Sequence, residues 1–239
     1  MCFTVKLLPL APHPLLLQAD HWFARAKAAQ LGALPCRRGC SRCCIGPFAI
    51  TILDAAELQR GLAALDAPNR QAIQDRARAQ TAAIEAAHPT LRHSPYLDTW
   101  EDRDLDALGE QFASLPCPAL AADGSCSVYP FRPMTCRLMG IPTETAGTVE
   151  GACEVQTAVP IVRLPRALRD AETELVRKEA EELAARARAR AREGEEMWLP
   201  YGFLPDRLSA PATPEPETIA TQAGLAGTPA GPRLDLDRP

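Results

Sequence analysis

The chain has 239 residues, of which 46% are apolar, so it can build one substantial hydrophobic core. Its net charge is −4, so it lacks the excess of basic residues that a nucleic-acid-binding domain normally has. No stretch reaches the ~18 uninterrupted apolar residues that a membrane-spanning helix needs. Prolines break the leucine-rich N-terminal run and no small-residue cleavage site follows it, so we expect a cytoplasmic protein without a signal peptide.

The N-terminal part of the chain predicts two helices separated by an extended segment. Residues 19–32 carry apolar side chains at helical spacing and predict the first helix. The apolar run FAITIL, residues 48–53, predicts a strand or a buried extended segment. Asp54 and Glu57 then match a capping pattern in which Asp54 accepts from a free backbone amide, so a second helix is expected over about 55–65.

The middle of the chain predicts two more helices and then an irregular segment. Pro68 suits the first turn of a helix that we expect to run to about His88. A polar loop with a solvated acidic run follows, and DLDALGEQFASL, residues 104–115, predicts a short helix. Residues 116–153 lose helical periodicity and contain prolines, glycines and four cysteines. Such a segment needs another source of order, and a bound metal ion supplies one.

A long charged helix is predicted over residues 165–196, with its acidic residues early and its arginines late, which suits the helix dipole. The apolar segment WLPYGFL, residues 198–204, is expected to dock on the core. The thin apolar stripe of the long helix comprises Leu168, Leu175, Val176 and Leu183. The chain thus divides into residues 1–34, an N-terminal segment and helix; 35–164, a cysteine-cluster metal-binding domain; 165–207, the long charged helix and docking segment; and 208–239, a disordered tail rich in proline, alanine and threonine.

The chain contains nine cysteines, eight of which fall into two groups. Disulfide frameworks belong to small secreted domains with meagre cores, whereas clustered cysteines in a reducing compartment indicate metal ligands or redox groups. A zinc ion or an iron centre prefers about four such soft ligands. The first group consists of Cys36, Cys40, Cys43 and Cys44, and the second of Cys117, Cys126, Cys136 and Cys153.

Cationic side chains surround the first group of cysteines. Arg37, Arg38 and Arg42 would offset the negative charge of bound thiolates and favour the deprotonated form that binds metal. Cys43 and Cys44 are adjacent, so we expect their side chains to diverge. Eight thiols allow two four-ligand sites, or one cluster with spare thiols, and both alternatives stay open.

Two other cysteine motifs fit the first group less well. Its C-x3-C-x2-C spacing matches the cluster motif of radical S-adenosylmethionine enzymes, but Arg42 stands where those enzymes usually place an aromatic residue. The repeated strand–helix units of their barrel are also missing from the predicted elements. A double zinc ribbon requires paired C-x2-C knuckles, and in this sequence only Cys40 and Cys43 have that spacing.

The two groups are connected by a longer pattern of specific residues. After the first four cysteines, it continues with Cys117-Pro118, Leu120, Gly124, Cys126, Tyr129, Arg132-Pro133 and Cys136-Arg137. This pattern resembles that of the YkgJ-type cysteine cluster family, also called the CxxCxxCC zinc- or iron-chelating domain. The resemblance spans roughly residues 30–155, and one departure is Ala119, where the family often has an aromatic residue.

The resemblance implies a bacterial protein with a metal or iron–sulfur centre held by these cysteines. Most of the family has no assigned biochemical role. A related branch includes flagellin lysine methylases, which carry the cysteine cluster and use S-adenosylmethionine. No glycine-rich cofactor loop in this sequence supports methyl transfer independently.

Three side chains have alternative interpretations. Arg132, in the Arg-Pro pair, is expected to fix a turn by donating to backbone carbonyls; the alternative is that Arg132 and Tyr129 orient the site. Arg137 either lies behind a ligand, orienting it and neutralising charge, or faces solvent. His21 is expected to be a surface or packing residue of the first helix.

We therefore expect a small, mostly α domain with few short strands, in which a cysteine-bound metal organises the irregular segment. The primary hypothesis is a zinc- or iron-binding protein, with an iron–sulfur cluster as one form of the centre, which acts through partner contact or metal handling. The alternative is an iron–sulfur enzyme that modifies protein side chains, similar to flagellin lysine methylases. The expected partners are a metal ion and a protein, with no membrane. A nucleic-acid adaptor is disfavoured by the acidic total charge; it would use Arg186, Arg188, Arg190 and Arg192.

Overall fold

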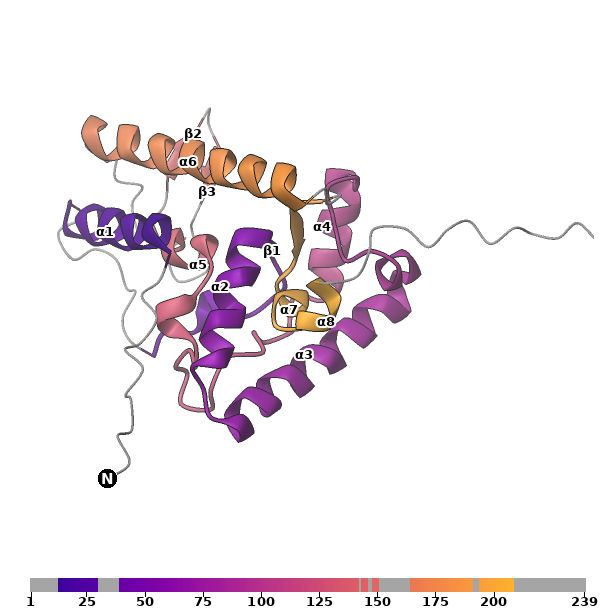
Figure 1. The fold of residues 1–239 in the computed structure, drawn as a ribbon. Helices are drawn as coiled ribbons and strands as arrows, with labels where there is room; N and C mark the ends of the chain where they lie inside the picture. The colour runs from indigo at the N-terminus through magenta and orange to yellow at the C-terminus, as the bar shows by residue number, and fades with distance from the viewer. Residues whose placement is uncertain are drawn as a thin grey trace, which may run out of the picture.

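Helices form most of the structure, a computed structural model that describes residues 13–29, 39–141, 143–145, 148–150, 164–190 and 194–208 (Figure 1). The mostly α fold predicted from the sequence is confirmed. The strands in these ranges form two small antiparallel pairs, β1 with β4 and β2 with β3. The helices are α1 (Pro14–Ala29), α2 (Ile52–Ala63), α3 (Ala67–Ala87), α4 (Asp102–Gln111), α5 (Met134–Leu138), α6 (Arg166–Arg190), α7 (Leu199–Gly202) and α8 (Pro205–Leu208). The strands are β1 (Ala49–Thr51), β2 (Thr143–Thr145), β3 (Thr148–Glu150) and β4 (Glu196–Trp198).

Helix α1 starts earlier than predicted and packs beside α6 (Figure 1). The predicted start at residue 19 is wrong because Pro14 suits the first turn of a helix and Leu16 is fully buried. The indole Nε1 of Trp22 donates to the carbonyl oxygen of Leu168 on α6, at 2.8 Å. His21 is exposed, as expected of a surface residue.

Helix α2 begins directly after strand β1, three residues before the predicted start. Thr51 ends the strand in an extended conformation and caps the helix: its hydroxyl accepts from the Asp54 amide at 3.2 Å. The Asp54 carboxylate accepts from the Thr51 amide at 3.2 Å, which completes a capping box. The assignment of Asp54 as the cap is therefore wrong, because Asp54 occupies the third position of the box. Helix α3 follows the prediction, with Asp66 accepting from the Asn69 amide at 2.9 Å and Pro68 in the first turn.

Strand β4 brings the C-terminal apolar segment back to β1. The register pairs Ala49 with Trp198 and Thr51 with Glu196. The prediction of helix up to residue 196 is wrong in its last part, because Gly194 has a left-handed φ of +104° and Glu196 belongs to the strand. Asp98, from the acidic run, accepts from the amides of Glu195 and Glu196 and so holds the start of β4.

The segment after β4 lies in the core, where α7 packs against both α2 and α3 (Figure 1). Tyr201 and Phe203 are fully buried, and Leu199 is nearly so. On α6 the apolar stripe is narrower than predicted: Leu168, Leu175 and Leu183 are buried, whereas Val176 is 57% exposed because it lies one residue off their face. Within the described helices, none is both long and apolar enough to cross a lipid bilayer. The predicted tail from residue 209 lies outside the described residues.

A glycine permits the close contact between α2 and the turn that precedes α5. A Cβ atom at Gly61 would lie 2.8 Å from Phe131 Cβ and 3.2 Å from Val128 Cβ. We expect Gly61→Ala to lower the free energy of unfolding by about 1–3 kcal/mol, because overpacking forces these groups apart. Urea denaturation would measure the loss.

The matched control is Gly109→Ala in α4, where a new Cβ meets nothing within 4 Å. Alanine there should raise the free energy of unfolding by about 0.5–1 kcal/mol, because it reduces the conformational freedom of the unfolded chain. Equal effects at the two positions would contradict the packing role of Gly61.

Candidate metal centre

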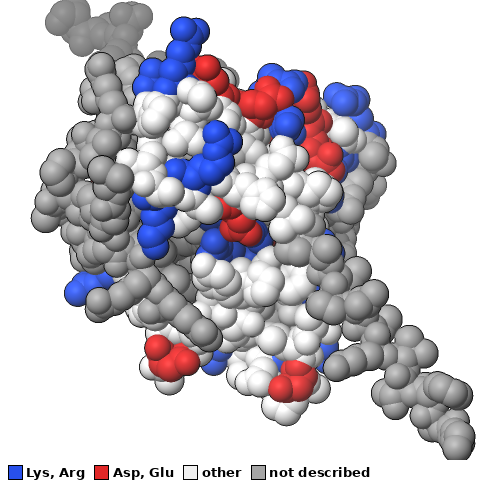
Figure 2. Space-filling model, turned by 90° about the vertical axis from the view of Figure 1, so that its left-hand side faces the viewer, with Lys and Arg blue, Asp and Glu red and all other residues white. Residues whose placement is uncertain are grey.

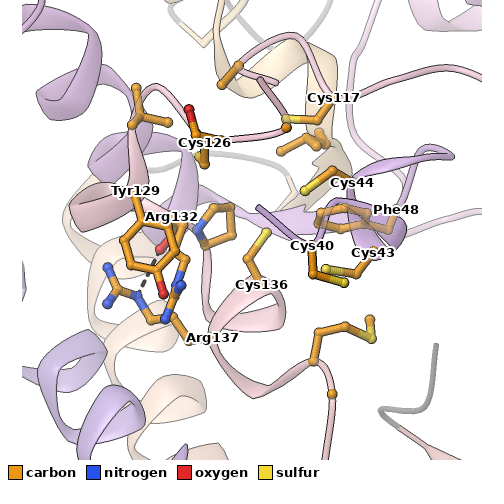
Figure 3. A pocket seen from close by; sticks show the side chains of 18 of the residues that line it. Cys40, Cys43, Cys44, Phe48, Cys117, Cys126, Tyr129, Arg132, Cys136 and Arg137 are labelled. Carbon is orange, nitrogen blue, oxygen red and sulfur yellow. Dashed lines mark hydrogen bonds between the residues drawn. The ribbon is translucent and has the colours of Figure 1, made fainter. Parts of the chain in front are cut away.

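Six of the eight cysteines proposed as ligands line one cavity of about 580 Å³ (Figure 3). All six are free thiols. Cys36 and Cys153 lie outside the described residues. The six come from parts of the sequence that are far apart: Cys40, Cys43, Cys44, Cys117, Cys126 and Cys136.

Backbone hydrogen bonds hold two of the cysteine-bearing segments together. The Cys117 amide donates to the Cys44 carbonyl oxygen at 2.7 Å, and the Gly46 amide donates to the Leu115 carbonyl oxygen at 2.7 Å. Cys43 and Cys44 belong to a single 3₁₀ turn, Arg42–Cys44. Their side chains do not diverge as predicted, since both line the cavity and a hydrogen bond joins the two thiols.

Gly124 fixes the approach of the second cysteine segment to the first. Its φ of +79° lies in the left-handed region, and a Cβ there would be 3.0 Å from the Gly39 carbonyl oxygen. This contact sets the loop that carries Cys117 and Cys126 beside the segment that begins with Gly39 and Cys40. A glycine is required here both by the backbone conformation and by the space.

The thiols differ in how readily they lose a proton. The hydrogen bond from Cys44 lowers the pKa of Cys43 to about 6, and the same bond raises the pKa of Cys44. Burial raises the pKa of Cys117 to about 12 and also raises the pKa values of Cys126 and Cys136. Most of these thiols are therefore neutral at pH 7, and metal binding must release their protons.

Among the cations predicted beside the thiols, Arg137 lines the cavity. Arg37 and Arg38 lie outside the described residues, and Arg42 is described but is not part of the lining. The described lining contains Lys27, Arg132 and Arg137 and no histidine, aspartate or glutamate. The cavity thus combines sulfur donors with positive charge, which suits an anionic thiolate centre.

Arg137, rather than Arg132, donates to backbone carbonyl oxygens. Arg132 was expected to donate to carbonyls, but its Nη2 donates to Asp20 at 2.9 Å and its Cζ lies 4.0 Å from the centre of the Tyr129 ring. Arg137 donates to the carbonyl oxygens of Arg132 and Pro130, at 2.9 and 2.7 Å, and pairs with Asp20. A solvent-facing Arg137 is excluded because its side chain is only 1% exposed.

The donor set fits a soft metal, but not as a ready-made site for one ion. Cysteine sulfur is the ligand that zinc and iron–sulfur centres favour. Within the described ranges, no three histidine, cysteine, aspartate or glutamate side chains are grouped so that they could hold one metal ion. The six thiols instead surround a space that is larger than one ion.

A mostly helical domain with a thiol-lined cavity of this kind defines a cysteine-cluster metal-binding protein. The chain belongs to the CxxCxxCC family, described as "Putative zinc- or iron-chelating domain", whose model matches residues 35–154. This confirms the family suggested by the cysteine pattern. Searches of curated proteins and of solved structures found no match to this chain.

The sequence did not indicate the side chains that complete the cavity from outside the cysteine segments. Phe23 and Lys27 reach the cavity from α1, and Leu199 and Phe203 reach it from the C-terminal segment. Phe23 and Lys27 are one helical turn apart, so their shared face could have been predicted, but its direction could not. Asp20, one turn earlier, binds both arginines.

Asp54 ties the cavity-lining helix α5 to α2. It is 1% exposed, and its carboxylate accepts from the Met134 amide at 2.7 Å. Burial raises the pKa of Asp54 from 3.8 to about 6, although its hydrogen bonds act in the opposite direction. The folded state therefore binds more protons than the unfolded state between these pH values, and this carboxyl group stabilises the fold less as the pH rises.

We expect the free energy of unfolding of the wild type, relative to Asp54→Asn, to fall on the order of 3 kcal/mol as the pH rises from about 4 to about 6. Above pH 6 the difference should be constant. Urea denaturation of both proteins across this range measures it, and titration of the cysteines cancels because both chains share them. A difference that does not change with pH would contradict the raised pKa.

Proposed function

We propose that this protein carries an iron–sulfur cluster in the cavity, bound by cysteines of the two groups. The family is described as chelating zinc or iron, and the donors in the described lining are sulfur atoms without carboxylate or imidazole. The observation that supports a cluster over a single ion is the spread of six thiols around about 580 Å³ with no three grouped on one point. A cluster offers several metal atoms to widely placed ligands.

The walls of the cavity suit such a centre. Phe23, Phe48, Leu58, Leu199 and Phe203 surround it with apolar surface. Apolar surroundings limit the access of water to the metal and influence its redox potential. The centre would supply electron transfer or structural order; whether it also supports modification of a protein side chain stays the alternative hypothesis.

The nucleic-acid alternative gains no support from the described surface. Arg186 pairs with Glu182 on the same helix, at 3.1 Å, and Arg177 pairs with Glu174 and Glu181. Figure 2 shows one face, on which basic side chains lie among uncharged surface and acidic side chains lie along the upper edge, near the centre and at the lower edge. A continuous basic stripe, which phosphate binding would need, is not seen on that face.

The test is elemental analysis of anaerobically purified protein together with its absorption spectrum. We expect iron and inorganic sulfide in roughly stoichiometric amounts and a brown protein that absorbs at about 400 nm. Cys40→Ser should lose this absorption, whereas Cys2→Ser, outside the matched region 35–154, should retain it. A colourless protein with zinc would contradict the cluster, and protein with neither metal would contradict metal binding itself.

A further inference from the structure

Arg132 stands at the cavity in a fixed orientation. Its Nη2 atom donates to Asp20 of α1 at 2.9 Å, and its guanidinium stacks on the ring of Tyr129, with Cζ 4.0 Å from the ring centre. Its side chain is 15% exposed, whereas Tyr129 is 59% exposed and covers it from outside. A guanidinium held by an ion pair to Asp20 and by the ring and hydroxyl of Tyr129 has little freedom to turn, so its Nε donor points in a set direction.

The Arg132 Nε donor lacks an acceptor in the part of the chain that the structure describes. Among the described side chains, three buried polar atoms have no hydrogen-bond partner: Arg132 Nε, Trp198 Nε1 and the Tyr201 hydroxyl. Of these three residues, only Arg132 lines the cavity. A buried N–H without an acceptor costs free energy, so such a donor in a native structure indicates a neighbour that becomes its acceptor in another state of the protein.

The cavity offers sulfur as the acceptor. Its described lining has no carboxylate, and the charge of Arg132 acts on the thiols of Cys126 and Cys43. Cys126 lies three residues before the turn Tyr129–Phe131, and the Tyr129 amide donates to the Cys126 carbonyl oxygen at 3.3 Å. Cys126 is therefore joined to Arg132 by a short, ordered piece of chain, whereas Cys43 lies on another segment (Figure 3). A metal-bound thiolate accepts hydrogen bonds, and cationic donors give the stronger ones.

We propose that Arg132 is a positioning residue of the centre, whose Nε donates a hydrogen bond to the Cys126 sulfur when that sulfur is bound as a thiolate. This inference rests on the proposed function. Asp20 and Tyr129 hold the guanidinium, and Nε supplies the donor. The positive charge and the hydrogen bond both stabilise the more negative, reduced form of the centre, so they raise its reduction potential.

The experiment compares Arg132→Met, Arg132→Lys and Asp20→Asn with the wild type after anaerobic reconstitution with iron and sulfide. Arg132→Met should lower the midpoint potential of the centre and should weaken iron retention against a chelator about ten- to a hundredfold. Arg132→Lys keeps the charge without the Nε donor, so it should restore the potential only in part. Asp20→Asn keeps Nε, so it should lower the thermal stability but leave the potential close to the wild-type value.

Each outcome decides between the roles. If Asp20→Asn lowers the potential as much as Arg132→Met, Arg132 acts only by anchoring α1, and the inference is wrong. If Arg132→Lys has the same midpoint potential as the wild type, the positive charge alone is sufficient and the Nε hydrogen bond is excluded. The same comparison tests the inference if Arg132→Met does not fold. A wild type without iron contradicts the proposed function instead. If it carries zinc, the same variants are compared by zinc affinity in chelator competition, with the same order expected.

Discussion

Cys136→Ser should yield a chain that no longer retains its metal and that unfolds at a much lower temperature. Cys136 belongs to α5, is half-buried and lines the cavity beside the segments that carry the other thiols. Serine is nearly isosteric, but its hydroxyl is a poor ligand for zinc or iron compared with a thiolate. Because metal-binding free energy is also folding free energy in such sites, we expect a stability loss on the order of 5 kcal/mol or more.

Metal analysis and thermal unfolding, each with and without a chelator, measure this effect. The chelator should lower the melting temperature of the wild type strongly and that of Cys136→Ser only slightly, since the variant has no metal to lose. Cys2→Ser should behave as the wild type in both conditions. A Cys136→Ser protein with the full metal content would remove Cys136 from the ligand set.

Arg137→Met should lower the free energy of unfolding by about 2–3 kcal/mol, because it removes the buried donor of two carbonyl oxygens and weakens the pairing of the partly exposed Asp20. The Arg137 side chain is 1% exposed and donates to the carbonyl oxygens of Arg132 and Pro130. Methionine would fill much of the volume but leave these two carbonyls without that donor and remove one of the two arginines that pair with Asp20. Urea denaturation followed by circular dichroism measures the loss.

Arg78→Met is the matched control for this substitution. Arg78 pairs with Asp75 at 3.1 Å on the surface of α3, and its side chain is 49% exposed. An exposed pair of this kind contributes at most about 1 kcal/mol, so the control should be close to the wild type. A similar small loss for Arg137→Met would mean that its buried donors are replaced by other groups.

Local signals predicted the parts of the fold that depend on neighbours in the sequence. Helix α3 has Pro68 at the expected place, and the crowding of Cys40, Cys43 and Cys44 indicated a shared site. The start of α2 was missed because two acceptors, Thr51 and Asp54, compete for the cap, and the choice depends on β1 pairing with β4. That pairing joins residues far apart in the chain.

The surroundings of the cysteines depend almost entirely on such distant contacts. Asp20 meets Arg132 and Arg137 only because α1 packs against α5. The sequence showed the arginines, but not which would be buried or which would lie beside a thiol. Two parts of the sequence analysis stay predictions. One is the assignment of individual ligands, including Cys36 and Cys153, and the other is the division of the chain at residues 34, 164 and 207.

The pairing of β1 with β4 joins the family region and the C-terminal segment in one hydrophobic core. The matched region ends at residue 154, yet Leu199 and Phe203 form part of the cavity wall. Gly202 fits so closely that a Cβ there would lie 2.5 Å from Ile50 Cδ1. In a fragment that ends at residue 154, one side of the thiol-lined cavity and the apolar surface of α2 would be exposed to water. Boundaries drawn from sequence similarity alone would thus divide a single hydrophobic core.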